Sequence, residues 1–342
     1  MKRSIVWLLT ISLLFSMCAC SLEQPDSFLD DALDDFAYGK PQEDYSLPNS
    51  GTLLDSLIDD YSGSYYMPDT HPMSDDDYAA ISKDDDDKED AGDSGNTAGG
   101  QIINGWYQVG DWSDFLNAFH YTYESTAESI QFKLVNGYTL TIPDAFQDAY
   151  TELQREDPIH ASGVASWSYW ISGNEYVVSI KYSYDIDEFI EMKEQTPELV
   201  TAAADSIDTE GMNAYEIVCA VNDYLCDTVY YPEEPYAPVT HTAYGALNNG
   251  VAVCEGYACA AKLLLNELGI MCDIQVGTCH GGGGHAWNLV KLEGDWYQMD
   301  VTWNDGSSSR SDYLLVTDNY MKKSRFWDES KYPKTPDKPY TP

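Results

Sequence analysis

A cysteine, a histidine and an aspartate stand where nucleophilic catalysis would need them. Cys254 lies where an extended run gives way to an amphipathic segment, whose apolar residues recur at helical spacing as far as Gly269. The N–H groups and the macrodipole at a helix start favour an anion, and a thiolate, the nucleophilic form of cysteine, becomes more abundant there. Structural cysteines also occur at helix starts, so the position of Cys254 alone leaves both roles open.

His285 and Asp300 follow in two predicted strands that form a hairpin. His285 begins the strand HAWNLVKL, the turn signal EGD surrounds Gly294, and Asp300 lies in the returning strand WYQMDVTW. A cysteine nucleophile needs a base within hydrogen-bond reach, and the base needs an acceptor that fixes its tautomer. A turn centred on Gly294 places Asp300 opposite Asn288 rather than His285, and a bulge or an offset turn could bring the pair together.

These residues carry a resemblance to a known family. The stretches AYGALNNGVAVCEGYACAAKLLLNELGI and HAWNLVKLEGDWYQMDVTWND resemble the core of the bacterial transglutaminase-like superfamily, which is similar in layout to papain-type cysteine proteases. The family pattern places cysteine before x-Gly-Tyr, histidine in His-Ala-Trp and aspartate in Val-Asp-x-Thr-Trp. Here these residues are Cys254, His285 and Asp300, and Met299 stands where the family often has valine. The resemblance covers about residues 215–326.

The resemblance implies an α+β fold with a papain/transglutaminase-like core and a catalytic triad. Cys254 would attack a carboxamide or peptide carbonyl, His285 would take up and later deliver a proton, and Asp300 would orient the imidazole. The backbone N–H of Cys254 could contribute to an oxyanion hole. The thioester would pass to water, as in a protease or amidase, or to an amine, as in crosslinking. We favour hydrolysis slightly, and we expect no cofactor.

Two alternatives remain open. A zinc site is conceivable because Cys272, Cys279, His280 and His285 cluster in the sequence, although their spacing matches no usual pattern. A non-catalytic surface protein that keeps the fold as a binding scaffold is the other alternative. An exported protein with six cysteines beyond its leader suggests disulfides, but a catalytic Cys254 would have to stay reduced.

The amino terminus resembles a bacterial lipoprotein signal. Lys2 and Arg3 precede an apolar run that is too short to span a bilayer, and Ala19 precedes Cys20, which would carry the lipid. Two acyl chains on Cys20 would anchor the protein to the outer face of the bacterial cell membrane. An ordinary cleaved signal (residues 1–20) is the alternative. Export predicts protein or peptide substrates at the cell envelope.

The next segment, residues 21–100, has 22 acidic residues against 3 lysines. Such a composition buries too little apolar surface to offset its ordering entropy, so we predict a disordered acidic tether. The whole chain of 342 residues has a formal net charge of -40. A surface this negative repels phosphate backbones, so nucleic acid is excluded as a partner, and we expect a monomer.

The folded part is predicted to contain two regions. Residues 101–205 form a small α+β module without assigned chemistry, and residues 206–342 form the transglutaminase-like catalytic domain. In the module, apolar spacing and turn signals predict a helix, a hairpin, a second helix and a second hairpin. The helices are expected at 111–121 and 143–156, and the hairpin turns at 136–137 and 173–174. A long helical stretch is expected over 198–230, opened by Pro197.

Overall fold

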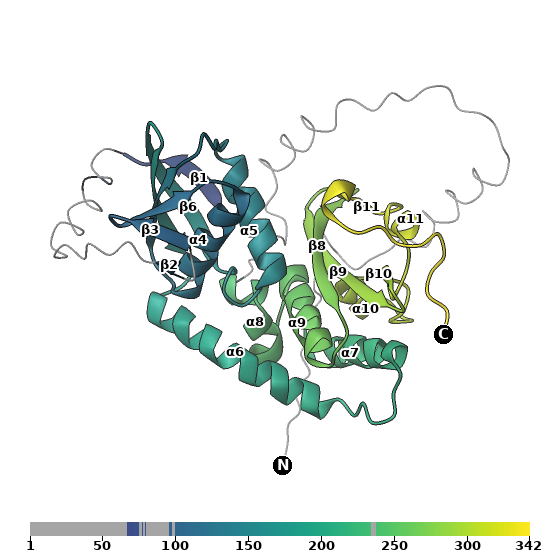
Figure 1. Ribbon diagram of the computed structural model, residues 1–342. Helices are drawn as coiled ribbons and strands as arrows, with labels where there is room; N and C mark the ends of the chain where they lie inside the picture. Colours follow the sequence, from purple (N-terminus) through teal and green to yellow (C-terminus); the bar gives the residue numbers. More distant parts are fainter. Residues whose placement is uncertain (1–66, 75–76, 78, 80–95, 98–99, 234–236) are drawn as a thin grey trace, which may run out of the picture. The chain divides into compact units, whose positions relative to one another are not determined.

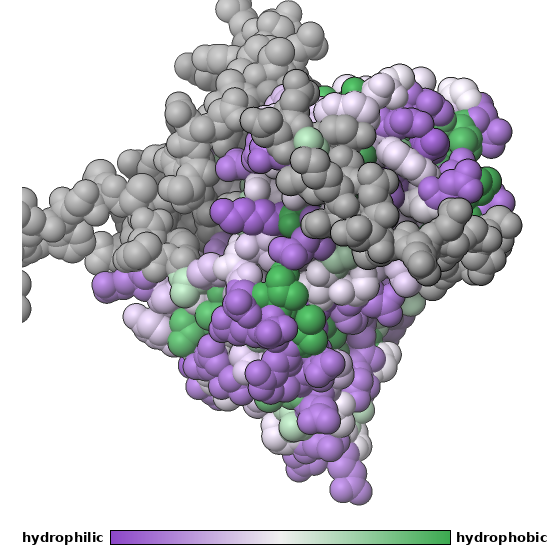
Figure 2. All heavy atoms as spheres, turned by 90° about the vertical axis from the view of Figure 1, so that its left-hand side faces the viewer, coloured by the Kyte–Doolittle hydropathy of each residue, from purple (hydrophilic) through white to green (hydrophobic). Residues whose placement is uncertain are grey.

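A computed structural model describes residues 67–74, 77, 79, 96–97, 100–233 and 237–342 (Figure 1). The predicted signal peptide, its Cys20 and most of the predicted tether lie outside these residues. The described part is a mixed α+β structure with two separate sheets, as the sequence predicts. None of its helices is both long and apolar enough to cross a bilayer. On the face shown in Figure 2, hydrophilic residues predominate between smaller hydrophobic patches.

The first sheet has seven strands among the described residues, in the order β1-β6-β7-β5-β4-β3-β2. Helices α4 and α5 pack against it, and aromatic side chains such as Phe115, Phe146 and Trp167 form the shared core. The strands are β1 Asp69–Pro72, β2 Asn96–Thr97, β3 Gly100–Ile103, β4 Trp106–Val109, β5 Ser129–Leu134, β6 Val164–Ser172 and β7 Glu175–Tyr182; the helices are α4 Trp112–Glu124 and α5 Asp144–Glu156.

Most of the predicted module elements form, but the first hairpin does not. Asp111 caps α4 by accepting a hydrogen bond from the Asp114 N–H, and Gly173 lies in the turn between β6 and β7. Asn136 and Gly137 both adopt positive φ, as a tight turn requires, yet no strand returns after them. The reason is that β5 already has β4 on one edge and β7 on the other, so no edge remains for a returning strand.

Part of the predicted disordered tether is folded. Asp69–Pro72 forms β1 and pairs in parallel with β6, with Asp69 opposite Ser166. For these four residues the prediction of disorder was wrong. Low apolar content predicts that a segment cannot build a core, but a short edge strand is held by backbone hydrogen bonds to a sheet that already exists.

The long predicted helix over 198–230 is two helices. Helix α6 spans Ile186–Ser206 and contains Pro197 inside it, and α7 spans Ala214–Thr228 behind an Asn213–Glu216 capping box. The prediction that Pro197 opens the helix was wrong, because burial of Phe189 and Met192 extends the apolar face of α6 upstream of the proline. Phe189 belongs to the core of the first sheet, while Val200 belongs to the core around α9, so α6 bridges both cores across the predicted boundary at residue 205.

The second sheet has the order β10-β9-β8-β11, and α9 packs along it (Figure 1). Buried aliphatic residues of α9, such as Leu264 and Leu265, share a core with Ile274, Val290 and Leu292 of the sheet. The elements of this part are the 3-10 helices η1 Pro238–His241 and η2 Glu329–Lys331, the helices α8 Ala243–Asn249, α9 Cys254–Glu267, α10 Val301–Asp305 and α11 Asp318–Met321, and the strands β8 Cys272–Cys279, β9 Gly284–Leu292, β10 Asp295–Met299 and β11 Arg325–Phe326.

Polar contacts join α5 to α9 and β8. The buried carboxylate of Glu255 accepts a hydrogen bond from Gln154, and Arg155 pairs with Asp273 at 2.5 Å between Nη2 and Oδ2. The ammonium of Lys262 donates to the backbone carbonyl of Arg155. The first sheet and its helices therefore support the helix that carries the predicted nucleophile.

Candidate active site

Cys254 is the first residue of α9, as the sequence predicts. Its side chain is fully buried. An extended segment leads into it, in which Val251 bridges to Tyr230 and the Val253 N–H donates to the Thr240 carbonyl at 2.9 Å. The N-cap residue Val253 offers no side-chain acceptor to the first turn of the helix. The N–H groups of that turn can therefore stabilise negative charge beside the sulfur.

The glycine and tyrosine that follow Cys254 fix the start of the helix. A Cβ at Gly256 would lie 2.5 Å from the Thr240 carbonyl oxygen, so only glycine lets η1 approach α9 this closely. The Tyr257 hydroxyl donates to Asp305 Oδ2 at 2.8 Å and so ties α9 to the end of α10. Both residues of the sequence motif thus position Cys254 through its neighbours.

His285 and Asp300 meet as the sequence predicts, although by a diagonal contact. His285 Nε2 lies 2.7 Å from Asp300 Oδ2, and both side chains are buried. The strand register pairs Met299 with Asn288, so the position after Met299 faces Trp287 rather than His285. His285 and Trp287 are two residues apart on β9 and therefore share a face, from which His285 reaches Asp300 across the diagonal.

Cys254 completes the group through His285. Burial by itself would lower the pKa of His285, but the charges of Asp300 and Cys254, together with the hydrogen bond to Asp300, raise the pKa to about 10. Because Nε2 bonds Asp300, Nδ1 is the ring nitrogen that remains for the sulfur. The three residues that the sequence singles out therefore lie in one group, in an arrangement that a nucleophile, a base and an acceptor would need.

Asp300 is held by more than the histidine. Its Oδ1 caps α10 by accepting the Trp303 N–H at 3.1 Å, and its Oδ2 accepts a hydrogen bond from Nη1 of the fully buried Arg325. Burial would raise the pKa of Asp300, but the charges and hydrogen bonds of His285 and Arg325 lower the pKa to about 2. The carboxylate of Asp300 is therefore ionised at neutral pH.

Arg325 and the aromatic residues around it belong to the site but were not predicted from the sequence. The imidazole of His285 lies between Trp287, with ring centroids 5.7 Å apart, and Trp303, at 5.8 Å. The Arg325 guanidinium packs over Trp303, 3.9 Å from the ring centroid. Arg325 is one of four arginines in the chain, and that scarcity beside an aromatic run was the signal in the sequence that could have been followed.

The zinc alternative is not supported by the side-chain positions. Cys272 and Cys279 lie at opposite ends of β8, a separation of roughly 23 Å in an extended strand, and His285 bonds Asp300. Among the described residues, no three His, Cys, Asp or Glu side chains form a group that could hold a metal ion. None of the six described cysteines forms a disulfide, so Cys254 is not held in one.

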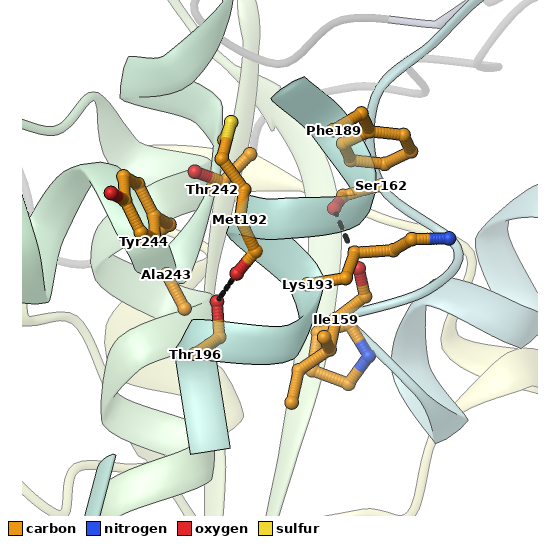
Figure 3. Close-up of a pocket in the computed structure, with 10 residues that line it drawn as sticks. Ile159, Ser162, Phe189, Met192, Lys193, Thr196, Thr242, Ala243 and Tyr244 are labelled. Carbon is orange, nitrogen blue, oxygen red and sulfur yellow. Dashed lines mark hydrogen bonds between the residues drawn. The ribbon is translucent and has the colours of Figure 1, made fainter. Parts of the chain in front are cut away.

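A small cavity and a larger one are found among the described residues, and the larger one is lined by Glu255, the residue after Cys254. The pocket in Figure 3, between α6 and the start of α8, has about 10 Å³ of space, which is barely enough for one water molecule. Its Lys193 donates to the Tyr123 carbonyl at 2.9 Å, and burial lowers the pKa of Lys193 to about 8. A larger cavity of about 210 Å³ is lined by Tyr184, His241 and Glu255 among others. In it, His241 Nδ1 lies 2.9 Å from the Glu255 carboxylate.

Residues 201–301 match the model of the family described as the Transglutaminase-like superfamily. The matched segment includes Cys254, His285 and Asp300 and is less than a third of the chain, and it is similar to a transglutaminase-like domain.

Two known proteins are similar to parts of the chain. Kyphoscoliosis peptidase of Mus musculus is 28% identical over 111 residues, which are 28% of this chain and 17% of the mouse protein. The chain thus spans less than a fifth of the length of that relative. A solved structure described as a TGase is 15% identical, with a TM-score of 0.29 over 68% of this chain and 59% of the other.

Proposed function

We propose that this protein is a cysteine enzyme that acts on amide or peptide bonds through a thioester intermediate. The observation that supports this most directly is the buried group in which His285 lies 2.7 Å from Asp300 and interacts electrostatically with Cys254. A structural cysteine needs neither a base nor an oriented base.

In the proposed reaction, the Cys254 thiolate attacks the carbonyl carbon of the substrate. The imidazolium of His285, oriented by Asp300, delivers its proton to the leaving amine, which departs and leaves the acyl group on sulfur as a thioester. The Cys254 backbone N–H at the start of α9 stabilises the oxyanion. The thioester then passes to a second nucleophile while His285 acts as the base.

Hydrolysis is the proposed fate of the thioester, and amine crosslinking is the competing one. Incubation of the purified protein with a glutaminyl peptide and a labelled amine distinguishes them. Release of ammonia without incorporation of the label supports hydrolysis, whereas incorporation of the label supports crosslinking. A Cys254→Ala variant should form neither product. If this variant forms as much product as the wild type, the proposal that Cys254 is the nucleophile is contradicted.

We further propose that the enzyme is a monomer held by a lipid on Cys20 at the outer face of the bacterial cell membrane. Its substrates would then be proteins or peptides of the envelope. A Cys20→Ser variant should move from the membrane fraction to the soluble exported fraction. Comparison of surface proteomes between wild-type and Cys254→Ala strains would identify the substrates.

A non-catalytic binding protein is the second candidate, and the burial of the site favours it. Cys254 has no exposed surface and His285 has 1%, so substrate can reach the sulfur only when neighbouring side chains move. Iodoacetamide separates the candidates because an enzyme must open to its substrate. Cys254 should be alkylated much faster than the other described cysteines if the site is catalytic, and no faster if the fold is a scaffold.

A further inference from the structure

Asp300 Oδ2 accepts hydrogen bonds from two cations on two different strands. His285 Nε2 reaches it from β9, and Arg325 Nη1 reaches it from β11. The other oxygen, Oδ1, accepts the Trp303 N–H. The carboxylate therefore has one oxygen fixed by the backbone and the other shared between the predicted base and an arginine.

The arginine is held rigidly in this position. Its guanidinium lies 3.9 Å from the Trp303 ring centroid, 5.1 Å from Trp287 and 5.4 Å from Tyr313, and the side chain is fully buried. Its backbone pairs with Cys279 of β8. Trp287 and Trp303 also contact the His285 ring, so the same aromatic side chains pack against both cations.

Stability alone gives a poor account of this arginine. Replacing a buried ion pair by apolar groups is often neutral or stabilising, and a buried guanidinium is costly unless its N–H groups are bonded. Nη2 of Arg325 is buried and has no hydrogen-bond partner among the described residues. The arrangement thus satisfies Asp300 better than it satisfies Arg325.

We propose that Arg325 is a positioning residue, whose guanidinium fixes the carboxylate of Asp300 so that Oδ2 stays directed at His285. This inference rests on the proposed function, because it assigns Arg325 to the same reaction. Arg325 acts through Asp300, since its Nη1 bonds that carboxylate. A lysine could supply the charge but not the planar, fixed geometry of the guanidinium.

The ionisable groups around the pair set the expected pH dependence. Asp300 faces His285 from β9 and Arg325 from β11, and His285 in turn faces Cys254 on α9. Tyr313 and Tyr320 both interact with Arg325. Arg325 lowers the pKa of Asp300, so its loss raises that pKa. Without Arg325, the carboxylate of Asp300 would be protonated at a higher pH than in the wild type. At that pH it would cease to stabilise the pair formed by the Cys254 thiolate and the His285 imidazolium.

The test is the rate of Cys254 alkylation by iodoacetamide from acid to neutral pH, resolved by mass spectrometry of each cysteine peptide in the full chain. In Arg325→Met, we expect the acid limb of the profile, which is the pH range over which the alkylation rate falls as the pH is lowered, to shift to higher pH by about one unit or more. In Arg325→Lys, the limb should stay close to that of the wild type while the rate falls. Arg310→Met is the control, because it removes an arginine from an exposed ion pair with Asp227. It should change neither the pH of the acid limb nor the alkylation rate.

A double-mutant cycle separates positioning from general stabilisation. If Arg325 acts through Asp300, Arg325→Met should have no further effect on the profile of Asp300→Asn. An additive effect, or an unchanged acid limb in Arg325→Met with an unchanged rate in Arg325→Lys, would overturn the inference. If Arg325→Met does not fold, the cycle is run with Arg325→Lys, whose rate defect should likewise vanish in Asp300→Asn. If wild-type Cys254 is alkylated no faster than the other cysteines, the proposed function itself fails, which is a different result.

Discussion

His285 contacts Asp300 diagonally, because the residue of β9 that faces the position of Asp300 is Trp287, two residues after His285. Strand β10 ends at Met299, which pairs with Asn288, and Asp300 already caps α10. Because Asp300 begins a helix, its side chain is fixed by the cap at Oδ1 while Oδ2 points to His285. The end of the strand and the start of the helix together aim the carboxylate.

Replacing this carboxylate by an amide should impair catalysis without unfolding the protein. Asp300→Asn keeps the volume of the side chain, but its NH2 group only donates, so it accepts neither the His285 nor the Arg325 hydrogen bond at the position of Oδ2, and in the flipped orientation it loses the Trp303 N–H instead. We expect kcat to fall about 10³- to 10⁴-fold, with a smaller change in KM. Steady-state kinetics on a released-amine assay measures this. Asp227→Asn, in an exposed ion pair, is the control and should retain its activity; equal losses in the two variants would contradict the role of Asp300.

The raised pKa of His285 predicts how stability depends on pH. A histidine whose pKa is raised on folding stabilises the protein fully below its ordinary pKa of about 6.5 and stops doing so as pH rises through its folded value, which is about 10 here. The free energy of unfolding should therefore fall more steeply with pH in the wild type than in His285→Gln. The difference in slope is at most about 1.4 kcal/mol per pH unit. Urea unfolding of both proteins between pH 6 and 10, in roughly unit steps, measures it. Parallel curves would show that His285 gains no proton affinity on folding.

Much of the site could be predicted because the residues around each of its members have a local sequence pattern that indicates a helix, a strand or a turn. The helix start at Cys254, the turn before β10 and the strand that contains His285 are all read from periodicity and turn residues. The diagonal contact could not be predicted, since it depends on where β10 ends and α10 begins. Arg325 could not be predicted either, because its role depends on the pairing of β11 with β8, a contact between segments far apart in sequence.

The errors in the fold have the same origin. The residues after Gly137 have the alternation of a strand, but the edges of β5 are taken by β4 and β7. Pro197 is typical of a helix start, but tertiary burial of the preceding turns carries α6 through it. In both cases the competition between elements for a packing surface decided the outcome, and that competition is not encoded locally.

A methyl group at Gly256 should disturb the site indirectly, through the contact between η1 and the start of α9. The Cβ of Gly256→Ala would lie 2.5 Å from the Thr240 carbonyl, so η1 or the start of α9 must shift. We expect a loss of about 1–3 kcal/mol in the free energy of unfolding and a reduced rate of Cys254 alkylation. Gly281→Ala, where a Cβ meets nothing within 4 Å, is the matched control and should change neither quantity. Equal effects of the two substitutions would refute the close approach.

The contact between Arg155 and Asp273 should stabilise the protein because it is partly buried. Asp273 also lies 3.7 Å from Lys262, and its side chain is only 18% exposed, so Asp273→Asn leaves two cations poorly compensated. We expect the free energy of unfolding in urea to fall by about 1.5–3 kcal/mol. Asp148→Asn is the matched control, since Asp148 pairs with Lys331 at 2.7 Å but is 51% exposed, and it should cost less than about 1 kcal/mol. If the two variants lose the same stability, burial is not what strengthens the pair, and the support that α5 gives to β8 must come from apolar packing instead.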